Sequence, residues 1–394
     1  MNKIQLTESH QISRNHPFYD ECDQLTFLSK NLWNATNYVV RQFYFKTGKH
    51  LSYEKVNKQF TDDNQKDYRA LPAKVAKGTQ RLLEKSYKSY FMKLKKKTIT
   101  KGKDKTPGYL HKTHGRQVVH YERGAISTTL KGFVKLSQTG IIIKTDKTVD
   151  FVRIVPKLGF FVIEVGYTVP LPAPSATTGK GTAAIDLGVG NLATVTSNVM
   201  NPLIISGKTI TNINTYCEYL LTKATKNHKT TRLAKAIYRK RRNKTKDYFH
   251  KTTAFLVKTL VDNNIENIVV GYNENWKDYA KLRHFSRVAY RTFVDLLTYK
   301  CQLAGITVTE IEESYTSKSS FFDLDKIPKL NDKKIPTFSG KRINRGNYRT
   351  GSGSIINADI NGSLNILRKS KLWQDNMFPD CVLHSLAPVR KYHE

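Results

Sequence analysis

The sequence predicts a mixed α+β chain of several domains, and three observations lead to that class. The 394 residues exceed the length of a typical single domain, and 39% of them are apolar, enough for more than one core. Apolar residues recur at helical spacing within residues 16–112, and strand-like runs lie on both sides of that region. From about residue 178 onward, strand-like and helix-like segments alternate.

The chain begins with one short strand-like run in residues 1–15 and continues with helices. Two apolar stripes have helical spacing: Leu25, Leu28, Leu32 and Val39 in the first, and Leu83, Tyr87, Tyr90, Phe91 and Leu94 in the second. Leu71 and Pro72 mark the entrance to the second helix, because proline is tolerated in the first turn. Its polar face carries Lys85 and Lys88 beside tyrosines, which favours contact with a nucleic-acid backbone over a merely solvated face.

Residues 116–169 show a strand pattern punctuated by Gly132, Gly140 and Gly159. The strand-like runs cover residues 118–121, 133–136, 141–144, 151–155 and 160–167. Together with the N-terminal strand, they predict a small antiparallel β-barrel. A proline-rich linker follows at residues 170–179, and a domain boundary is expected near its end.

The second half of the chain alternates between strands and helices. Strands are predicted over residues 183–187, 192–197, 202–206, 265–270 and 306–311, and helices over residues 214–263 and 285–304. A hairpin of strands followed by strand–helix alternation is typical of an RNase H-like sheet. The long helix carries Arg239, Lys240, Arg241 and Arg242 in succession, a further candidate surface for nucleic acid.

The charge balance points to a polyanionic partner. Lys and Arg number 66 against 32 Asp and Glu, which gives a formal net charge of +34. The alternatives are a generally lysine-rich protein and a membrane-surface protein. No apolar run approaches the roughly 20 residues of a membrane span, and the N-terminus does not resemble a signal peptide. We therefore expect an intracellular protein with no membrane partner.

The four cysteines, Cys22, Cys217, Cys301 and Cys381, are widely scattered and form no C-x-x-C pair. This spacing disfavours both a disulfide framework and a cysteine-rich zinc site. Free buried thiols in a reducing compartment are the expected outcome.

Three carboxylates have distinctive settings. Asp186 lies inside an apolar strand pattern, Glu313 follows another strand, and Asp359 opens a helix-like segment. A charge inside an apolar strand is costly unless something pairs with it, although a lone Asp there is more often a structural hydrogen-bond acceptor. Three such groups could instead hold two Mg²⁺ ions for polynucleotide hydrolysis, because Mg²⁺ prefers oxygen ligands and keeps several waters.

With these residues the chain resembles TnpB, the transposon-encoded RNA-guided DNA endonuclease related to Fanzor proteins and type V CRISPR effectors. AIDLGVGNLAT (184–194) is similar to the first RuvC motif and NADINGSLNI (357–366) to the third. LPAKVA (71–76) and KSYKSYF (85–91) resemble the family's recognition domain. The resemblance implies a guide RNA, a double-stranded DNA target beside a short adjacent motif, Mg²⁺ and no small-molecule cofactor. It implies that Asp186, Glu313 and Asp359 are the catalytic metal ligands.

The resemblance also implies a division into domains. Residues 1–15 and 113–178 would form a wedge barrel and linker, 16–112 a helical recognition domain, 179–313 and 357–394 the RuvC domain and tail, and 314–356 an insert that binds target nucleic acid.

The chain departs from the usual TnpB pattern at the second RuvC motif. Gly271 stands where the family usually has a glutamate, and Glu313 is similar to the relocated glutamate of some lineages. Adjacent strands lie about 4.8 Å apart, so a glutamate at the end of the neighbouring strand could reach the same metal. Glu312 is the competing candidate, because alternate residues point to opposite faces. The spacing from Glu313 to the following Thr316, Ser317 and Lys318 favours Glu313.

The insert departs as well, because it lacks the four zinc-ribbon cysteines that many members carry. We expect no structural zinc, and expect apolar contacts to hold the insert together, through Phe321, Phe322, Ile335 and Phe338. Its cations Lys318, Lys341, Arg342 and Arg345 are predicted to contact nucleic acid, with an exposed solvated loop as the alternative.

Three other functions remain open. The missing glutamate at position 271 is compatible with an RNA-guided repressor that has lost cleavage. A small type V CRISPR effector derived from TnpB would share every motif. A DDE-type transposase would act without RNA.

Overall fold

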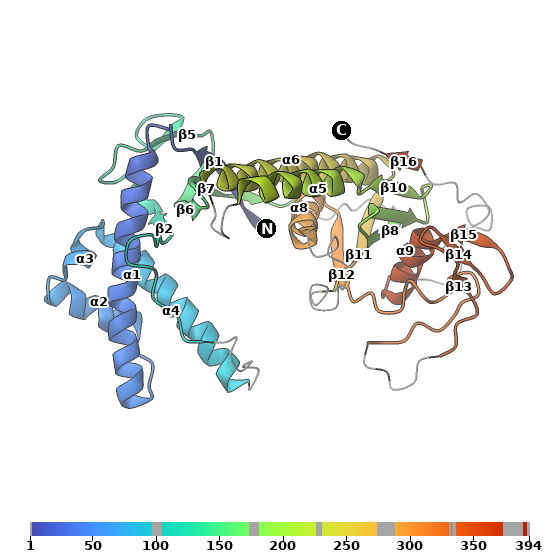
Figure 1. Ribbon diagram of the computed structural model, residues 1–394, viewed down its shortest axis with the longest axis horizontal. Helices are drawn as coiled ribbons and strands as arrows, with labels where there is room; N and C mark the ends of the chain where they lie inside the picture. The colour runs from blue at the N-terminus through green and yellow to red at the C-terminus, as the bar shows by residue number, and fades with distance from the viewer. Residues whose placement is uncertain are drawn as a thin grey trace. The chain divides into compact units, whose positions relative to one another are not determined.

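The computed structural model describes residues 2–96, 105–172, 181–225, 231–273, 288–330, 332, 336–372 and 389–391. The chain divides into two compact units, Lys3–Pro170 and Leu171–Glu394 with Met1–Asn2, which are taken in turn below. Figure 1 shows the elements of both. No helix among the described residues is long and apolar enough to cross a membrane.

The strands of the first unit form two antiparallel sheets. The larger has the order β1-β7-β6-β2, and the smaller the order β3-β4-β5. Their bounds are β1 Lys3–Ile12, β2 Val119–Glu122, β3 Ile126–Ser127, β4 Phe133–Leu136, β5 Ile142–Lys144, β6 Val149–Lys157 and β7 Phe160–Pro170, with a short 3₁₀ turn at Arg123–Ala125. The expected strands are present, but the described strands do not close into one barrel.

Helices fill the region between β1 and β2: α1 Tyr19–Thr47, α2 Tyr53–Asp62, α3 Lys66–Arg69 and α4 Ala73–Lys95. α1 ends at Gly48, whose positive φ of 67° lets its N–H bond back to Tyr44. α4 starts directly after Pro72. α1 and α4 are joined by the Tyr87 hydroxyl, which is fully buried and donates to Asn37 Oδ1 at 2.7 Å.

The second unit is built on a six-stranded mixed sheet of order β12-β11-β8-β9-β10-β16. The strands are β8 Gly181–Leu187, β9 Asn191–Ser197, β10 Leu203–Ser206, β11 Ile265–Gly271, β12 Thr307–Ile311 and β16 Val389–Lys391. β8, β11 and β12 are parallel, so their carboxyl ends meet at one edge of the sheet. β8, β9 and β10 form an antiparallel meander beside them.

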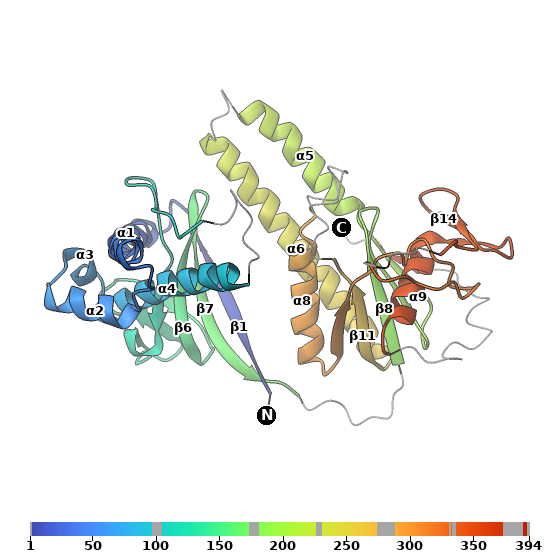
Figure 2. The ribbon, with the colours of Figure 1, turned by 90° about the horizontal axis from the view of Figure 1, so that it is seen from below.

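Helices cover both faces of this sheet. Ile185 of β8 and Val270 of β11 belong to the core shared with α6 (Arg232–Asp262) and α8 (Tyr290–Leu303), whereas Ala184 and Val269 pack with α9 (Ala358–Lys369). Figure 2 shows α8 and α9 beside the sheet. Because side chains alternate across a strand, Asp186 and Gly271 share the α9 face with Ala184 and Val269.

The single helix expected over residues 214–263 is wrong, because two helices occupy this region. α5 spans Lys208–Ala224 and α6 spans Arg232–Asp262. Thr225 is extended at the end of α5, and Thr231 caps α6 by accepting a bond from the Ala234 N–H at 3.1 Å. Basic residues continue across the junction between the two helices, so the sequence pattern does not indicate the break. Of the helix expected over residues 285–304, residues 285–287 lie outside the described part.

The insert between β12 and α9 contains a small antiparallel sheet of β13 (Lys341–Arg342), β14 (Asn347–Arg349) and β15 (Ile355–Asn357). Phe321 is buried against α9, Phe322 packs beside it, and Phe338 lies 6.5 Å from the ring of Tyr315. Ile335 lies outside the described residues.

Polar contacts add to this packing. Asp325 accepts bonds from the Ser320 N–H at 2.8 Å and the Ser339 hydroxyl at 2.7 Å. Asp323 accepts from the Gly351 N–H at 2.6 Å. The insert is therefore stabilised by buried aromatic rings and by two carboxylates that link distant loop segments.

Candidate metal centre

Asp186 lies one residue before the end of β8, on the face that α9 covers. The helix approaches it closely at Gly362, where an added Cβ would lie 2.9 Å from Asp186 Oδ2. A side chain at this position would push against the carboxylate. Glycine therefore allows α9 to pack directly over Asp186.

Glu313 lies two residues after β12 ends. Gly271, the last residue of the neighbouring strand β11, pairs with Ile311. An added Cβ at Gly271 would lie 3.2 Å from Glu313 Oε2 and 2.5 Å from Ile366 Cδ1. The space at position 271 is therefore next to the Glu313 carboxylate.

Glu312 has other partners. Its Oε2 accepts from Lys369 Nζ at 2.9 Å, and its Oε1 accepts from the Ser314 N–H at 2.5 Å. Burial acts to raise its pKa, but the hydrogen bonds from Lys369 and Ser314 outweigh it and lower the pKa below its usual value. This carboxylate is already neutralised by the chain.

Asp359 lies in the first turn of α9, where Asn357 caps the helix. The Asn357 Oδ1 accepts from the Asp359 N–H at 3.0 Å. The Asp359 carboxylate accepts from Asn191 Nδ2 at 2.7 Å and from Arg342 Nη2 at 3.1 Å. β9 and the insert thus both fix its orientation.

The three carboxylates act on one another electrostatically. The pKa of Asp186 is raised well above its usual value, first by burial and then by the negative charges of Glu313 and Asp359. Arg342 and the Leu187 N–H oppose this rise. The charges of Glu313 and Asp359 thus disfavour ionisation of Asp186, and the three carboxylates together form a negative locus.

The three carboxylates do not converge on one point. Among the described residues, no group of three or more His, Cys, Asp or Glu could hold a metal ion as it stands. The repulsion between like charges and the bonds of Asp359 to Asn191 and Arg342 give a physical reason for this spread.

The predicted cations fall into separate groups. In the insert, Arg342 reaches Asp359, and Arg345 lies near Gly190, where an added Cβ would be 3.3 Å from Arg345 Nη2. Lys318 and Lys341 are exposed. Of the four insert cations, Arg342 is thus the one for which an ion pair with a candidate carboxylate is seen among the described residues.

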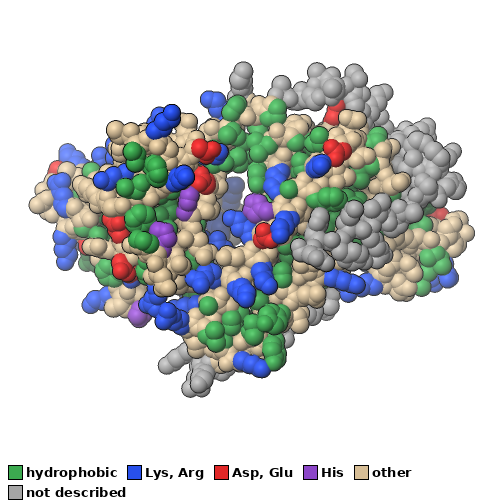
Figure 3. All heavy atoms as spheres, turned by 90° about the horizontal axis from the view of Figure 1, so that it is seen from above, with side chains coloured by type: hydrophobic (Ala, Val, Ile, Leu, Met, Phe, Trp, Pro, Cys, Tyr) green, Lys and Arg blue, Asp and Glu red, His purple; other side chains and the backbone are tan. Residues whose placement is uncertain are grey.

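The other predicted cations lie on helices. On α6, Lys240 and Arg242 are exposed, and Arg239 and Arg241 are half-buried. Figure 3 shows numerous Lys and Arg side chains on the face it draws. Lys85 and Lys88 are exposed on α4 in the first unit, and Lys88 pairs with Glu84 at 3.1 Å.

Three residues near the carboxylates escaped the sequence prediction. Asn191 bonds Asp359, and Gly362 makes room for Asp186. Tyr290, at the start of α8, is buried, and burial together with Asp186 and Glu313 raises its pKa. Asn191 and Gly362 lie within the two quoted motifs, which is the signal that could have found them. Tyr290 has no comparable signal.

Two family profiles match separate parts of the chain between residues 161 and 366. Residues 161–277 match the probable transposase family OrfB of IS605 elements, and residues 290–366 match the Cas12f1-like TNB domain. A comparison with curated protein sequences finds no match.

Solved structures show weak similarity over most of the chain. A Cas12f1–sgRNA–target DNA complex is 13% identical with a TM-score of 0.37, covering 92% of this chain and 98% of that one. A CRISPR-Cas12f ternary complex is 14% identical with a TM-score of 0.35, covering 88% and 81%. The AacC2c1–sgRNA binary complex is 10% identical with a TM-score of 0.30, covering 84% and 65%.

The two profile matches together define a protein of the transposase-related, Cas12f-like class. Together these matches support a TnpB-like family for the chain.

Proposed function

We propose that the chain is an RNA-guided DNA endonuclease of TnpB type that cuts double-stranded DNA beside a short adjacent motif. One observation carries the catalytic part of this proposal. Asp186 lies at the carboxyl end of β8, Glu313 follows the end of the parallel strand β12, and Asp359 opens the helix over them; burial first, and then the charges of Glu313 and Asp359, raise the pKa of Asp186. A negative locus of this kind within a protein of net charge +34 suits a cation rather than an anion.

The donor set suits Mg²⁺. All three side chains offer hard carboxylate oxygens. Because Gly271 and Gly362 have no side chains, there is room beside them for the carboxylates of Glu313 and Asp186. Asp186, Glu313 and Asp359 would hold the ions. When bound, two Mg²⁺ ions would supply activation of water and stabilisation of the leaving oxygen.

The chain's own residues would prepare the site. Asn191 and Arg342 fix Asp359, and the bond of Glu312 to Lys369 keeps that second glutamate engaged elsewhere. Arg342 and Arg345 place positive charge beside the carboxylates, where they could orient a phosphate of the strand to be cut. This geometry favours Glu313 over Glu312 as the third ligand.

The proposed partners are a guide RNA and double-stranded target DNA. Base pairing would read the target sequence, and the protein would read shape and the adjacent motif. The units described above would act as the wedge and recognition domains (residues 1–15, 113–178 and 16–112) and as the RuvC domain with its insert (residues 179–394). No zinc is needed in this proposal.

The neighbouring glutamates provide a matched test. The ribonucleoprotein is purified with its RNA, and cleavage of a target-matched plasmid is measured in Mg²⁺. Glu313→Gln should lower the cleavage rate by about 100-fold or more, because a metal ligand is lost. Glu312→Gln, with the same change in charge one residue away, should cut at nearly the wild-type rate. Equal loss in both variants, or loss in Glu312→Gln alone, contradicts the assignment of Glu313.

A second candidate function is RNA-guided DNA binding without cleavage. The observation in its favour is the pair between Arg342 and Asp359, at 3.1 Å, which neutralises one of the three carboxylates. In that case the wild-type ribonucleoprotein would bind the matched plasmid in Mg²⁺ and leave it uncut. RNA-free protein that joins DNA strands would instead support a transposase.

A further inference from the structure

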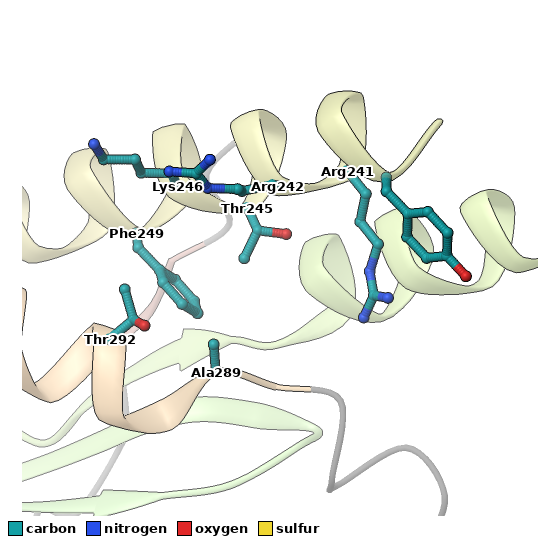
Figure 4. A pocket seen from close by; sticks show the side chains of 8 residues that line it. Arg241, Arg242, Thr245, Lys246, Phe249, Ala289 and Thr292 are labelled. Atoms are coloured by element: carbon teal, nitrogen blue, oxygen red, sulfur yellow. The ribbon is translucent and has the colours of Figure 1, made fainter. Parts of the chain in front are cut away.

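A cavity of about 430 Å³ opens along the middle of α6. Its lining comes from α6 and from the start of α8: Tyr238, Arg241, Arg242, Thr245, Lys246 and Phe249, with Ala289 and Thr292 (Figure 4). Three of these side chains are cations and none is a carboxylate. The cavity therefore has a positive wall.

The cavity interrupts an apolar helix face. The lining residues of α6 follow helical spacing and lie on one face. Toward the N-terminus of that face, Ala234 and Ile237 pack with α5, and toward the C-terminus Leu256 and Leu260 belong to the core. Between them the face carries Arg241 and Thr245. Asn214 of α5 is a partner of Arg241, and the cations that the cavity exposes are Arg242 and Lys246.

The cavity walls are held in place by neighbouring elements. Arg241 Nε donates at 2.8 Å to Oδ1 of Asn214, a buried residue of α5. Phe249 is fully buried and meets Phe293 edge-on, with ring centroids 5.4 Å apart. Figure 4 shows Thr245 and Phe249 directed toward the α8 side, whereas Arg242 and Lys246 extend along α6. The site thus combines a fixed floor over Phe249 with cations and the exposed ring of Tyr238 in its lining.

The geometry points to a binding site for one unstacked nucleotide of a single-stranded nucleic acid. Arg242 and Lys246 would hold its phosphate, and its base or sugar would enter over Ala289, with Tyr238 as the exposed aromatic ring of the lining. Cations paired with an aromatic surface recognise single strands. The volume lies within the range of about 300–1,000 Å³ that is typical of small-ligand sites. This assignment rests on the proposed function only in requiring that the chain binds nucleic acid.

The test uses the full-length protein in EDTA with fluorescently labelled oligonucleotides, measured by anisotropy. The probes are one single-stranded RNA, the single-stranded DNA of the same sequence, and the DNA duplex. Ala289→Phe fills the cavity without changing the charge. It should weaken single-strand binding about tenfold, the scale of one base–aromatic contact, and leave duplex binding unchanged. The single strand that loses more affinity, RNA or DNA, identifies the source of the nucleotide.

A charge variant provides a second test if Ala289→Phe has a lower melting temperature than the wild type. Arg242→Gln removes an exposed cation from the rim, and Lys258→Gln removes an exposed cation from α6 outside the cavity. Arg242→Gln should reduce single-strand affinity several-fold more than Lys258→Gln does. It should also lower the slope of log affinity against log salt concentration by about one.

The measurements distinguish failure of the nucleotide site from failure of the proposed function. Unchanged single-strand binding in Ala289→Phe, or equal losses in Arg242→Gln and Lys258→Gln, overturns the nucleotide site. Wild-type protein that binds none of the probes contradicts the proposed function as well. Because EDTA prevents cleavage, the binding result is independent of whether the carboxylates catalyse.

Discussion

At the residue scale, Asp186 connects stability with function. Its folded-state pKa is raised, so the native state binds its proton more tightly than the unfolded state does. The contribution of Asp186 to the free energy of unfolding is therefore greatest below its unfolded-state pKa and falls as pH rises through the raised pKa. Without metal, the ionised form of this carboxylate destabilises the fold, and a bound divalent cation would reverse that effect.

Asp186→Asn should consequently raise the melting temperature in metal-free buffer at neutral pH. Relief of about 1 kcal/mol would correspond to roughly 2–4 °C for a unit of this size. The same variant should lose the rise in melting temperature that Mg²⁺ or Mn²⁺ gives the wild type. Thermal denaturation with and without metal measures both; a variant that is less stable without metal would contradict the electrostatic account.

Gly271 has a steric role beside Glu313. Gly271→Ala places a methyl group against Ile366 and 3.2 Å from Glu313 Oε2, so either α9 or the glutamate must move. We expect a plasmid-cleavage rate at least tenfold lower with unchanged RNA binding. Gly108→Ala is the control, because an added Cβ at this loop glycine would have no contacts and its φ is not positive. Wild-type cleavage by Gly271→Ala would show that Glu313 does not depend on this space.

Arg342 should oppose metal binding and assist nucleic-acid binding. Removing its charge beside Asp359 makes the locus more negative. Arg342→Ala is therefore expected to bind Mn²⁺ several-fold more tightly by calorimetry in the absence of DNA, while its plasmid cleavage slows. Lys341→Ala, one residue away and exposed, should leave Mn²⁺ affinity nearly unchanged. Weaker Mn²⁺ binding in Arg342→Ala would indicate that the arginine organises the ligands instead.

At the element scale, the insert replaces expected apolar packing with a mixture of rings and carboxylates. Asp325→Ala removes bonds to Ser320 and Ser339 and should cost about 1–3 kcal/mol of stability. Asp332→Ala, at an exposed loop, should cost much less. A zinc chelator should leave the wild-type melting curve unchanged. A fall in melting temperature with the chelator would reveal a zinc site.

The elements also show how far the sequence can predict this fold. Strands such as β4 and β8 were predictable because runs of apolar residues end at glycines or at turns. The break between α5 and α6 was not, because the cap at Thr231 is a single hydroxyl within a continuous basic pattern. Whether the strands of the first unit close into a barrel depends on pairing between distant segments, which periodicity does not encode.

The candidate site likewise contains residues that the sequence predicts and residues that only the packing reveals. Asp186 and Asp359 stand out in the sequence because a charge interrupts an apolar run. Gly362 and Asn191 do not, because their roles arise only when α9 packs over β8 and β9. The roles of all three carboxylates as metal ligands stay predictions, with Glu313 now supported by its position beside Gly271.

At the scale of the whole molecule, the net charge of +34 should dominate non-specific binding. Contacts with six to ten phosphates would lower affinity about 10³- to 10⁵-fold between 50 and 200 mM salt. Titration of the RNA-free protein with random-sequence DNA over this range measures the slope. A shallow slope would show that the cations are engaged within the protein.

The most direct test of the central claim is cleavage of a target-matched plasmid by the purified ribonucleoprotein in Mg²⁺, with Asp186→Ala beside the wild type. The account predicts that the wild type linearises the plasmid, that EDTA stops it, and that Asp186→Ala retains its RNA and binds the plasmid without cutting. A wild-type ribonucleoprotein that binds but never cuts, or an Asp186→Ala variant that cuts at the wild-type rate, would contradict it.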